Sequence, residues 1–220
     1  MKLYQGKHLM PEQTDTPTNT PEDNKYYDQR SVALRTTQSI CFVKDHDKAA
    51  MLSLLLQAYK TAQVVIVVKS KKKADALSTL LNEKAFKAIA VHGNHRQTQQ
   101  QEAASKFNDA TLHVIITTDM ILKILALENI KLLVSYDLPE MSQEYYNRLA
   151  LMKELGVAIA LVSPEDEPLL SDIEYNMKKE IEEKAIEGFE STPAHQNKVK
   201  KDRTKKPRHR KNKARKEDNL

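Results

Sequence analysis

The 220-residue sequence has one cysteine, four glycines and no tryptophan. A single cysteine, Cys41, excludes an intrachain disulfide framework and a zinc site built on several cysteines, and it favours a reducing cytoplasm as the compartment. The scattered glycines exclude the clustered Gly-rich loops that cradle phosphate groups. No run approaches the roughly 18 apolar residues of a membrane helix, and the first residues lack the apolar core of a secretory signal.

Charge is unevenly distributed along the chain. Residues 191–220 hold 12 Lys and Arg against 3 Asp and Glu, a net +9, whereas residues 1–190 hold 23 against 27, a net −4, and the two sum to the formal +5. The end segment has too few apolar residues to offset its ordering entropy, so we expect a disordered basic tail over residues 188–220. Such a block attracts nucleic-acid phosphates by releasing counterions; a solubilising tail without a partner is the alternative. The cations predicted to bind are Lys200, Lys201, Arg203, Lys205, Lys206, Arg208, Arg210 and Lys211.

The chain divides into an arm, a folded region and the tail. Residues 1–37, rich in Pro, Thr, Asn and charge, predict a disordered arm. Between residues 38 and 187, short apolar runs alternate with helical patterns. The expected strands cover residues 40–43, 64–68, 88–91, 112–116, 130–134 and 157–162. The expected helices cover residues 48–60, 72–83, 97–107, 120–127, 142–155 and 166–186.

Most of these apolar runs are continuous and rich in β-branched residues, which is typical of parallel strands covered on both faces. Repeated strand–helix alternation then predicts one α/β domain with an open parallel sheet of about six strands and helices on both faces. Cys41 lies inside such a run, so we expect it in the core rather than as a nucleophile.

Ligands of open α/β sheets bind at the carboxyl ends of the strands. Residues 69–73, KSKKK, follow one strand and open a helix that Ser70 can cap, which suits either a phosphate site or a solvated helix start. His92 and His95 follow another strand, but no third metal ligand accompanies them, and no metal is predicted. Thr117, Thr118 and Asp119 follow the next strand, and residues 136–139, YDLP, the one after.

The order of these segments is more specific than any one of them. VVIVVKS, AVHGNHRQTQQQEAASKF, LHVIITTDM and LLVSYDLPEMSQEYYNRL follow one another over residues 64–149. This series resembles the second RecA-like domain of DEAD-box RNA helicases, a branch of superfamily 2, over roughly residues 39–174. The resemblance implies a RecA-like fold and contact with RNA.

The resemblance also implies particular RNA contacts. Ser70 takes the place of the residue that touches phosphate after the matching strand. In the family's H-G-D…Q…R stretch, His92, Gly93 and Gln97 match, while Asn94 and Gln100 replace the acid and the arginine. Thr118 matches the threonine of T-D-x-x-x-R-G-x-D. The implied RNA-binding set is Ser70, His92, Gly93, Gln97, Thr117, Thr118 and Lys123.

The positions that correspond to the family's nucleotide-binding motifs match those motifs poorly. Asp119 and Arg148 are the residual nucleotide-site positions, and Ala126 replaces the carboxylate that holds the ribose. In the family's H-R-x-G-R-x-G-R motif, the two γ-phosphate arginines fall on Leu151 and Glu154. Because an arginine finger is worth roughly 10³–10⁵ in rate, and because neither a phosphate loop nor an Asp-Glu-Ala-Asp box occurs in this chain, we expect no catalytic residues and no cofactor.

Three hypotheses follow for a lone, degenerate helicase domain. The first is a non-catalytic RNA-binding protein in RNA metabolism or ribonucleoprotein assembly. The second is an adapter that docks on a helicase or ribosome-associated partner through an apolar face at Leu149, Leu151 and Met152. The third is a helicase that binds ATP only when another chain completes it in trans.

Overall fold

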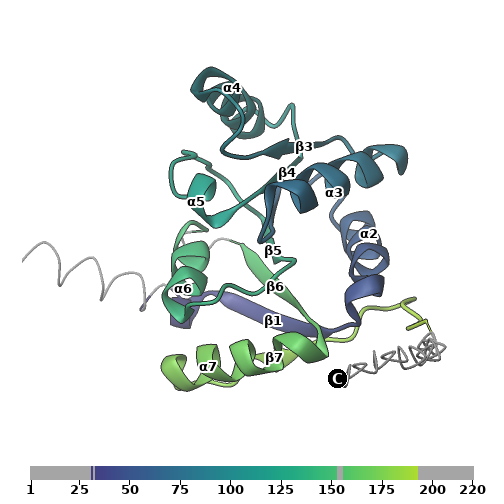
Figure 1. Cartoon of the computed structure of the whole chain (residues 1–220), viewed down its shortest axis with the longest axis vertical. Coiled ribbons are helices and arrows are strands. Elements are labelled where there is room, and N and C mark those ends of the chain that lie inside the picture. Colours follow the sequence, from purple (N-terminus) through teal and green to yellow (C-terminus); the bar gives the residue numbers. More distant parts are fainter. Residues whose placement is uncertain (1–30, 32, 153–155, 193–220) are drawn as a thin grey trace, which may run out of the picture.

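The computed structural model describes residues 31, 33–152 and 156–192. Its centre is a seven-stranded sheet (Figure 1). The strands are β1 (Thr37–Phe42), β2 (Val64–Val67), β3 (Ala88–Val91), β4 (Val114–Thr117), β5 (Leu132–Ser135), β6 (Val157–Val162) and β7 (Glu182–Glu183). The predicted open parallel α/β sheet is confirmed, with seven strands in place of about six.

The strands lie in the order β3-β4-β2-β5-β6-β1-β7, and every neighbouring pair is parallel. All strand carboxyl ends therefore lie along one edge of the sheet, which we call the carboxyl edge. The residues that precede the strands lie along the opposite, amino edge. This arrangement brings together loops that are far apart in the sequence.

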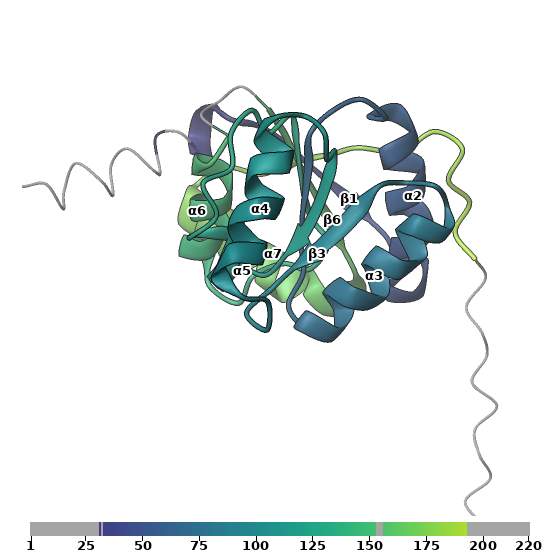
Figure 2. The ribbon, with the colours of Figure 1, turned by 90° about the horizontal axis from the view of Figure 1, so that it is seen from above.

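Helices cover both faces of the sheet, as Figure 2 shows from above. They are α2 (Lys48–Ala58), α3 (Lys71–Glu83), α4 (Gln97–Asn108), α5 (Asp119–Leu122), α6 (Ser142–Ala150) and α7 (Glu167–Met177), with short 3₁₀ turns η1 (Asp45–Asp47) and η2 (Pro164–Asp166). Helices α2 and α3 supply one core layer, and α4 to α7 supply the other.

Successive strand residues point to opposite faces, and both faces are apolar. In β2, Val65 and Val67 join the layer under α4 to α7, whereas Val64 and Ile66 join the layer under α2 and α3. This two-sided burial explains why the strand sequences are continuous apolar runs rather than alternating ones. Cys41 lies in the second layer with 1% of its surface exposed, which confirms its predicted place in the core.

The last helix is shorter than predicted. The sequence pattern predicts a helix over residues 166–186, but α7 ends at Met177 because Lys178 adopts a left-handed conformation with φ 55°. The backbone N–H of Ile181 then donates to the Glu174 side chain at 2.8 Å, and the chain turns back to form β7 beside β1. The end was missed because this C-cap is a lysine where a glycine is usual.

Packed residues continue on both sides of the predicted domain limits at residues 38 and 187. Ala33 and Thr36 are buried before β1, and Phe189 packs against the core layer under α2. Most of the predicted arm and tail, including all eight predicted tail cations, lies outside the described residues. Within the described part of the chain, no helix is long and apolar enough to cross a membrane.

Candidate nucleic-acid interface

The loops that follow β2, β3 and β4 meet at the carboxyl edge. The Lys71 Nζ donates to the Asn94 side-chain oxygen at 2.8 Å, which joins the loops after β2 and β3. A Cβ placed on Gly93 would lie 3.6 Å from the Lys71 Nζ and 4.0 Å from the Ile121 Cδ1. Because Ile121 belongs to α5, which follows β4, three separate loops form one continuous surface.

Ser70 caps α3, as the sequence predicts. Its hydroxyl accepts a hydrogen bond from the Lys73 N–H at 3.2 Å. Lys71 and Lys72 occupy the exposed first turn of the helix. The helix N-terminus carries partial positive charge, so this turn attracts anions by its dipole and by two ammonium groups.

The turn after β3 is held by a buried histidine. His92 is 4% exposed, and its Nε2 lies 2.8 Å from an Asp75 carboxylate oxygen. The His92 backbone N–H donates to the His95 Nδ1 at 3.1 Å, and the Gln100 side-chain amide donates to the His95 carbonyl at 3.0 Å. The His92 side chain therefore positions the turn and does not face solvent.

The other residues predicted to contact RNA differ in exposure. Gly93, Gln97 and Lys123 are exposed, and Thr118 is half-buried at the N-cap of α5. Thr117 is fully buried, so its side chain cannot reach a bound strand. Lys123 forms an ion pair across to α6, with its Nζ 2.7 Å from a Glu144 oxygen.

Asp119 and Arg148 are bonded to each other. The Arg148 Nε and one terminal nitrogen donate to the two Asp119 carboxylate oxygens at 2.6 and 2.7 Å, and the other terminal nitrogen donates to the Asp137 carbonyl at 2.9 Å. Arg148 is 1% exposed. This arginine thus joins α6 to the ends of β4 and β5, and all three of its nitrogens are occupied within the fold.

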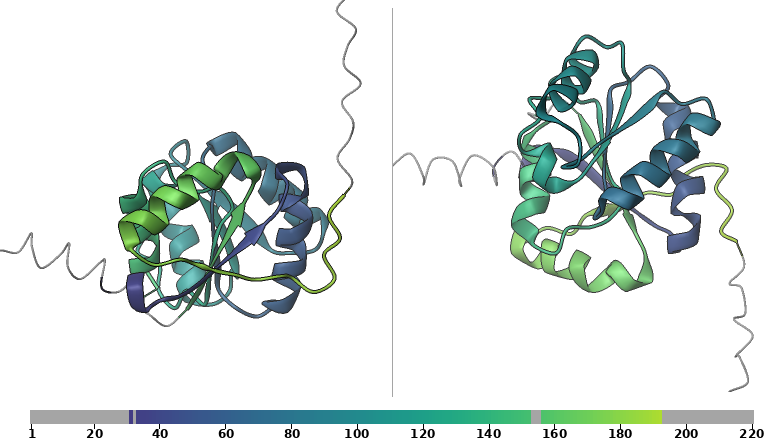
Figure 3. Two further views of the ribbon diagram at one scale, coloured as in Figure 1. Left: turned by 90° about the horizontal axis from the view of Figure 1, so that it is seen from below. Right: turned by 45° about the horizontal axis from the view of Figure 1, so that its top comes forward.

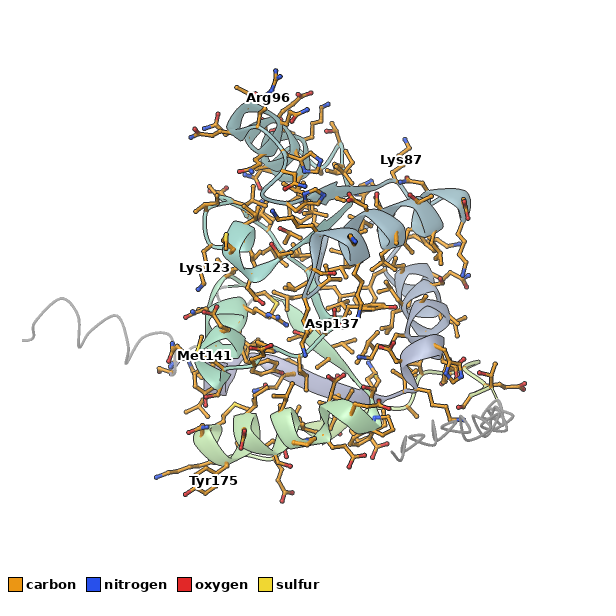
Figure 4. The ribbon with its side chains drawn as sticks, viewed as in Figure 1. Lys87, Arg96, Lys123, Asp137, Met141 and Tyr175 are labelled. Carbon is orange, nitrogen blue, oxygen red and sulfur yellow. The ribbon has the colours of Figure 1, made fainter. Side chains whose placement is uncertain are left out.

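Two further carboxylates organise the centre of the edge. Asp137, near the middle of the view in Figure 4, accepts the Lys69 backbone N–H at 2.9 Å and the Lys73 Nζ at 2.7 Å. Asp166 accepts the buried Lys48 Nζ at 2.7 Å and lies 4.0 Å from the Lys69 Nζ. Three lysines therefore face two aspartates.

Burial alone would raise the pKa of Asp166, but hydrogen bonds from Lys48 and Ser163 outweigh it and lower that pKa. Tyr136 lies beneath the Lys48 and Lys73 ammonium groups. Burial raises the pKa of its hydroxyl to about 12, with Asp45 and Asp137 acting in the same direction. Tyr136 is therefore neutral at physiological pH and serves as an aromatic support for the lysines.

Sequence reasoning missed the positioning roles of Gln100 and Lys48. Both are buried on the apolar stripes of their helices. Gln100 precedes Ala103, Ala104 and Phe107 at helical spacing, so a polar residue inside an apolar stripe was the available signal.

The predicted apolar docking face is wrong in its main residues. Leu149 is fully buried and Met152 is 2% exposed, because both lie on the core side of α6 and the turn after it. Only Leu151 remains partly exposed. It lines a cleft of about 350 Å³ between α5 and α6, together with Leu122 and the polar groups of the Asp119 and Glu144 pairs.

No group of three or more metal-ligating side chains occurs in residues 31, 33–152 and 156–192. His92 and His95 are stacked, with ring centroids 4.1 Å apart, and their ring nitrogens serve Asp75 and the backbone. The histidine pair is thus used internally to hold the turn.

Comparison with known proteins identifies the domain. Residues 47–150 match the family model described as helicase conserved C-terminal domain. Among curated proteins, ATP-dependent RNA helicase SUB2-2 of Vanderwaltozyma polyspora is 34% identical over 152 residues, 67% of this chain and 34% of that protein. ATP-dependent RNA helicase FAL1 of Mycosarcoma maydis is 30% identical over 146 residues. The chain spans about a third of the length of these relatives.

Solved structures show the same fold. A DEAD box protein from Methanococcus jannaschii superposes with a TM-score of 0.66 at 24% identity, covering 70% of this chain and 43% of that one. E. coli SrmB, solved bound to regulator of ribonuclease activity A, superposes with a TM-score of 0.64 at 18% identity, covering 72% of this chain and 97% of that one. Saccharomyces cerevisiae Dbp5, bound to RNA and ADP BeF3, superposes with a TM-score of 0.64 at 19% identity, covering 78% of this chain and 50% of that one.

The fold is thus the RecA-like α/β architecture of helicases. The matched domain is a helicase C-terminal domain of the kind found in DEAD-box RNA helicases.

Proposed function

We propose that this chain binds single-stranded RNA through the carboxyl-edge loops and the basic tail, and that it does not hydrolyse ATP by itself. The contact between Lys71 and Asn94 carries the proposal, because it joins the exposed polar loops after β2 and β3 across the end of β4, which lies between these two strands. Dbp5, which shares the fold, was solved with RNA bound. The contact set is Ser70, Lys71, Lys72, Gly93, Gln97 and Thr118 from the loops, with the eight tail cations named above.

The proposed lack of ATP hydrolysis is supported by the residues that replace the arginine fingers. Leu151 stands at one finger position and lines the α5–α6 cleft, and Glu154, at the other, lies outside the described residues. The remaining arginine of the motif, Arg148, is held by Asp119 and a backbone carbonyl. Arg148 is also 1% exposed, so its guanidinium is not available to a phosphate unless it leaves these partners.

The salt dependence of RNA binding tests the loop contacts. The binding constant of the full chain is measured for a fluorescent single-stranded RNA over a salt series. The logarithm of this constant falls linearly with the logarithm of the salt concentration, and each phosphate contact adds about 0.7 to the steepness of the slope. The double variant Lys71→Gln/Lys72→Gln removes two carboxyl-edge cations. It is expected to reduce the slope by about 1.4.

A matched control uses the opposite edge. Lys87→Gln/Lys131→Gln removes two exposed lysines that precede β3 and β5 and therefore lie at the amino edge. Figure 4 shows Lys87 far from Lys123. The control is expected to keep the wild-type slope. Equal slopes for the two double variants would refute contact by the carboxyl-edge loops.

An adapter role is the second candidate, and exposed apolar residues around α5 favour it. Met120 is 76% exposed and Ile124 is 66% exposed, and Ile124 lines a cleft beside α4 with Gln101. SrmB, which shares the fold, was solved with a protein regulator bound. The adapter role predicts that Met120→Gln/Ile124→Gln abolishes binding to a protein partner and leaves RNA affinity unchanged. Loss of RNA affinity in this variant would contradict it.

A further inference from the structure

The chain after β7 is attached to the fold along α2. The Lys184 backbone N–H donates to the Ile40 carbonyl at 2.8 Å. Ile186 and Phe189 then pack against the core layer under α2, and Phe189 lines a shallow cleft with Leu54. In the left view of Figure 3, this yellow-green segment runs from the side of α7 across the molecule to α2. The packing leads the chain toward Thr192, the last described residue.

The hydroxyl, the backbone N–H and the carbonyl of Thr192 all form hydrogen bonds. Its hydroxyl donates to one Asp47 carboxylate oxygen at 2.6 Å, and its backbone N–H donates to the other at 3.1 Å. Its carbonyl accepts the Lys44 Nζ at 2.7 Å, and the His46 Nε2 lies 2.9 Å from its hydroxyl oxygen. The Thr192 hydroxyl bond is the main cause that lowers the pKa of Asp47. We call the Asp47–Thr192 contact the tail anchor.

The tail anchor lies at the carboxyl edge. Asp47 is 4% exposed and ends the 3₁₀ turn that follows β1. The next residue, Lys48, bonds to Asp166, which lies 4.0 Å from the Lys69 Nζ. A short series of side-chain contacts therefore connects the anchor to the loop that opens α3, where the proposed RNA contacts begin.

We propose that Asp47 and Thr192 fix the start of the basic tail beside the carboxyl-edge loops, so that both contact one RNA strand at the same time. This inference rests on the proposed RNA binding. Lys198, the first tail cation, is six residues beyond Thr192, so it lies within about 20 Å of the anchor whatever path the chain takes. An anchored tail is present at a higher effective concentration near RNA already held by the loops.

The gain in effective concentration depends on the length of chain between the last attached residue and the first tail cation. Without the anchor, the last attachment is Phe189 or Lys184, which lie 9 and 14 residues before Lys198 in place of six. Effective concentration falls roughly as the −3/2 power of length, which gives a loss of about two- to fourfold. The number of phosphate contacts stays the same, so the salt slope is expected to stay the same.

The test uses the full chain and a fluorescent single-stranded RNA of 20 nucleotides. Asp47→Ala and Thr192→Val each open the anchor, and both are expected to weaken binding about two- to fourfold. Asp45→Ala is the matched control, because Asp45 carries the same charge as Asp47 and lies two residues before it. The Asp45 side chain is 68% exposed. The control is expected to bind as the wild type does or slightly more tightly, since it also removes a negative charge.

Hydrogen exchange of the Thr192 amide reports on the anchor itself. The amide is expected to exchange slowly in the wild type and in Asp45→Ala, and quickly in Asp47→Ala. Fast exchange in the wild type, or anchor variants that bind RNA as the control does, would overturn the inference. Absence of RNA binding by the wild-type chain would instead refute the proposed function and, with it, the use of the anchor.

Discussion

The Arg148 side chain offers the sharpest test of how the carboxyl edge is built. Replacing it with alanine removes three hydrogen bonds of 2.6, 2.7 and 2.9 Å that join α6 to Asp119 and to the Asp137 carbonyl. The guanidinium is 1% exposed, so no water takes its place without rearrangement. The Asp119 carboxylate is left without its cation.

Removing one partner of a buried ion pair costs about 3–5 kcal/mol. Asp119 is 26% exposed, so water reaches one side of the carboxylate, and we expect the lower end of the range, about 3 kcal/mol, for Arg148→Ala. Arg148→Lys keeps the charge but lacks the planar fork, and we expect a loss of about 1–2 kcal/mol.

Urea unfolding of the full chain, followed by circular dichroism, measures these losses. The corresponding fall in melting temperature is about 6–12 °C for Arg148→Ala. In a double-mutant cycle with Asp119→Ala, the double variant is expected to be more stable than the sum of the single losses predicts, by about 1–3 kcal/mol.

Two results would refute the reasoning. A loss below about 0.5 kcal/mol for Arg148→Ala is the size expected of an ordinary surface substitution, and it would mean that the network does not hold the edge together. Additive losses in the cycle would mean that Arg148 and Asp119 stabilise the fold independently.

Three further predictions concern other sites. Burial raises the pKa of the Cys41 thiol to about 11, so a thiol reagent at pH 8 is expected to label the unfolded chain and leave the native chain unlabelled; rapid native labelling would contradict the burial. Gly156→Ala places a Cβ 2.6 Å from a backbone carbonyl oxygen and is expected to cost about 1–3 kcal/mol in urea unfolding, whereas Gly93→Ala, whose nearest neighbour is at 3.6 Å, is expected to cost nothing measurable. The pKa of Asp166 is lowered in the fold, so its contribution to stability is complete above its unfolded value of about 3.9 and is lost as the pH falls through the folded value; Asp166→Asn is expected to flatten this part of the stability–pH curve, and an unchanged curve would contradict the assignment.

The sheet could be predicted because its signals are local. The run from Val64 to Val68 is apolar on both faces and matches β2 to within one residue. The Ser70 cap and the start of α4 at Gln97 likewise follow from short patterns. The early end of α7 could not be predicted, because the left-handed residue that ends it is Lys178, and the pairing of β7 with β1 that follows joins segments far apart in the sequence.

The candidate site was only partly predictable, because burial is a tertiary property. Resemblance to the helicase family pointed to His92 and Thr117, but the fold buries both side chains. Gln100 stands in the apolar stripe of α4, but Lys48 looks like an ordinary solvated helix residue until its partner Asp166, 118 residues away, is known. Leu149 was expected on a docking face, yet α6 turns it into the core.

Binding of single-stranded RNA by a tail-neutralised full chain tests the central claim most directly. In this variant the eight predicted tail cations are replaced by glutamine, which lowers the net charge of residues 191–220 from +9 to +1, and affinity is measured at low salt beside the wild type. We predict weaker but measurable binding that is lost when Lys71→Gln/Lys72→Gln is added. Complete loss of binding on neutralising the tail would contradict a nucleic-acid site on the folded domain, and it would favour the adapter role.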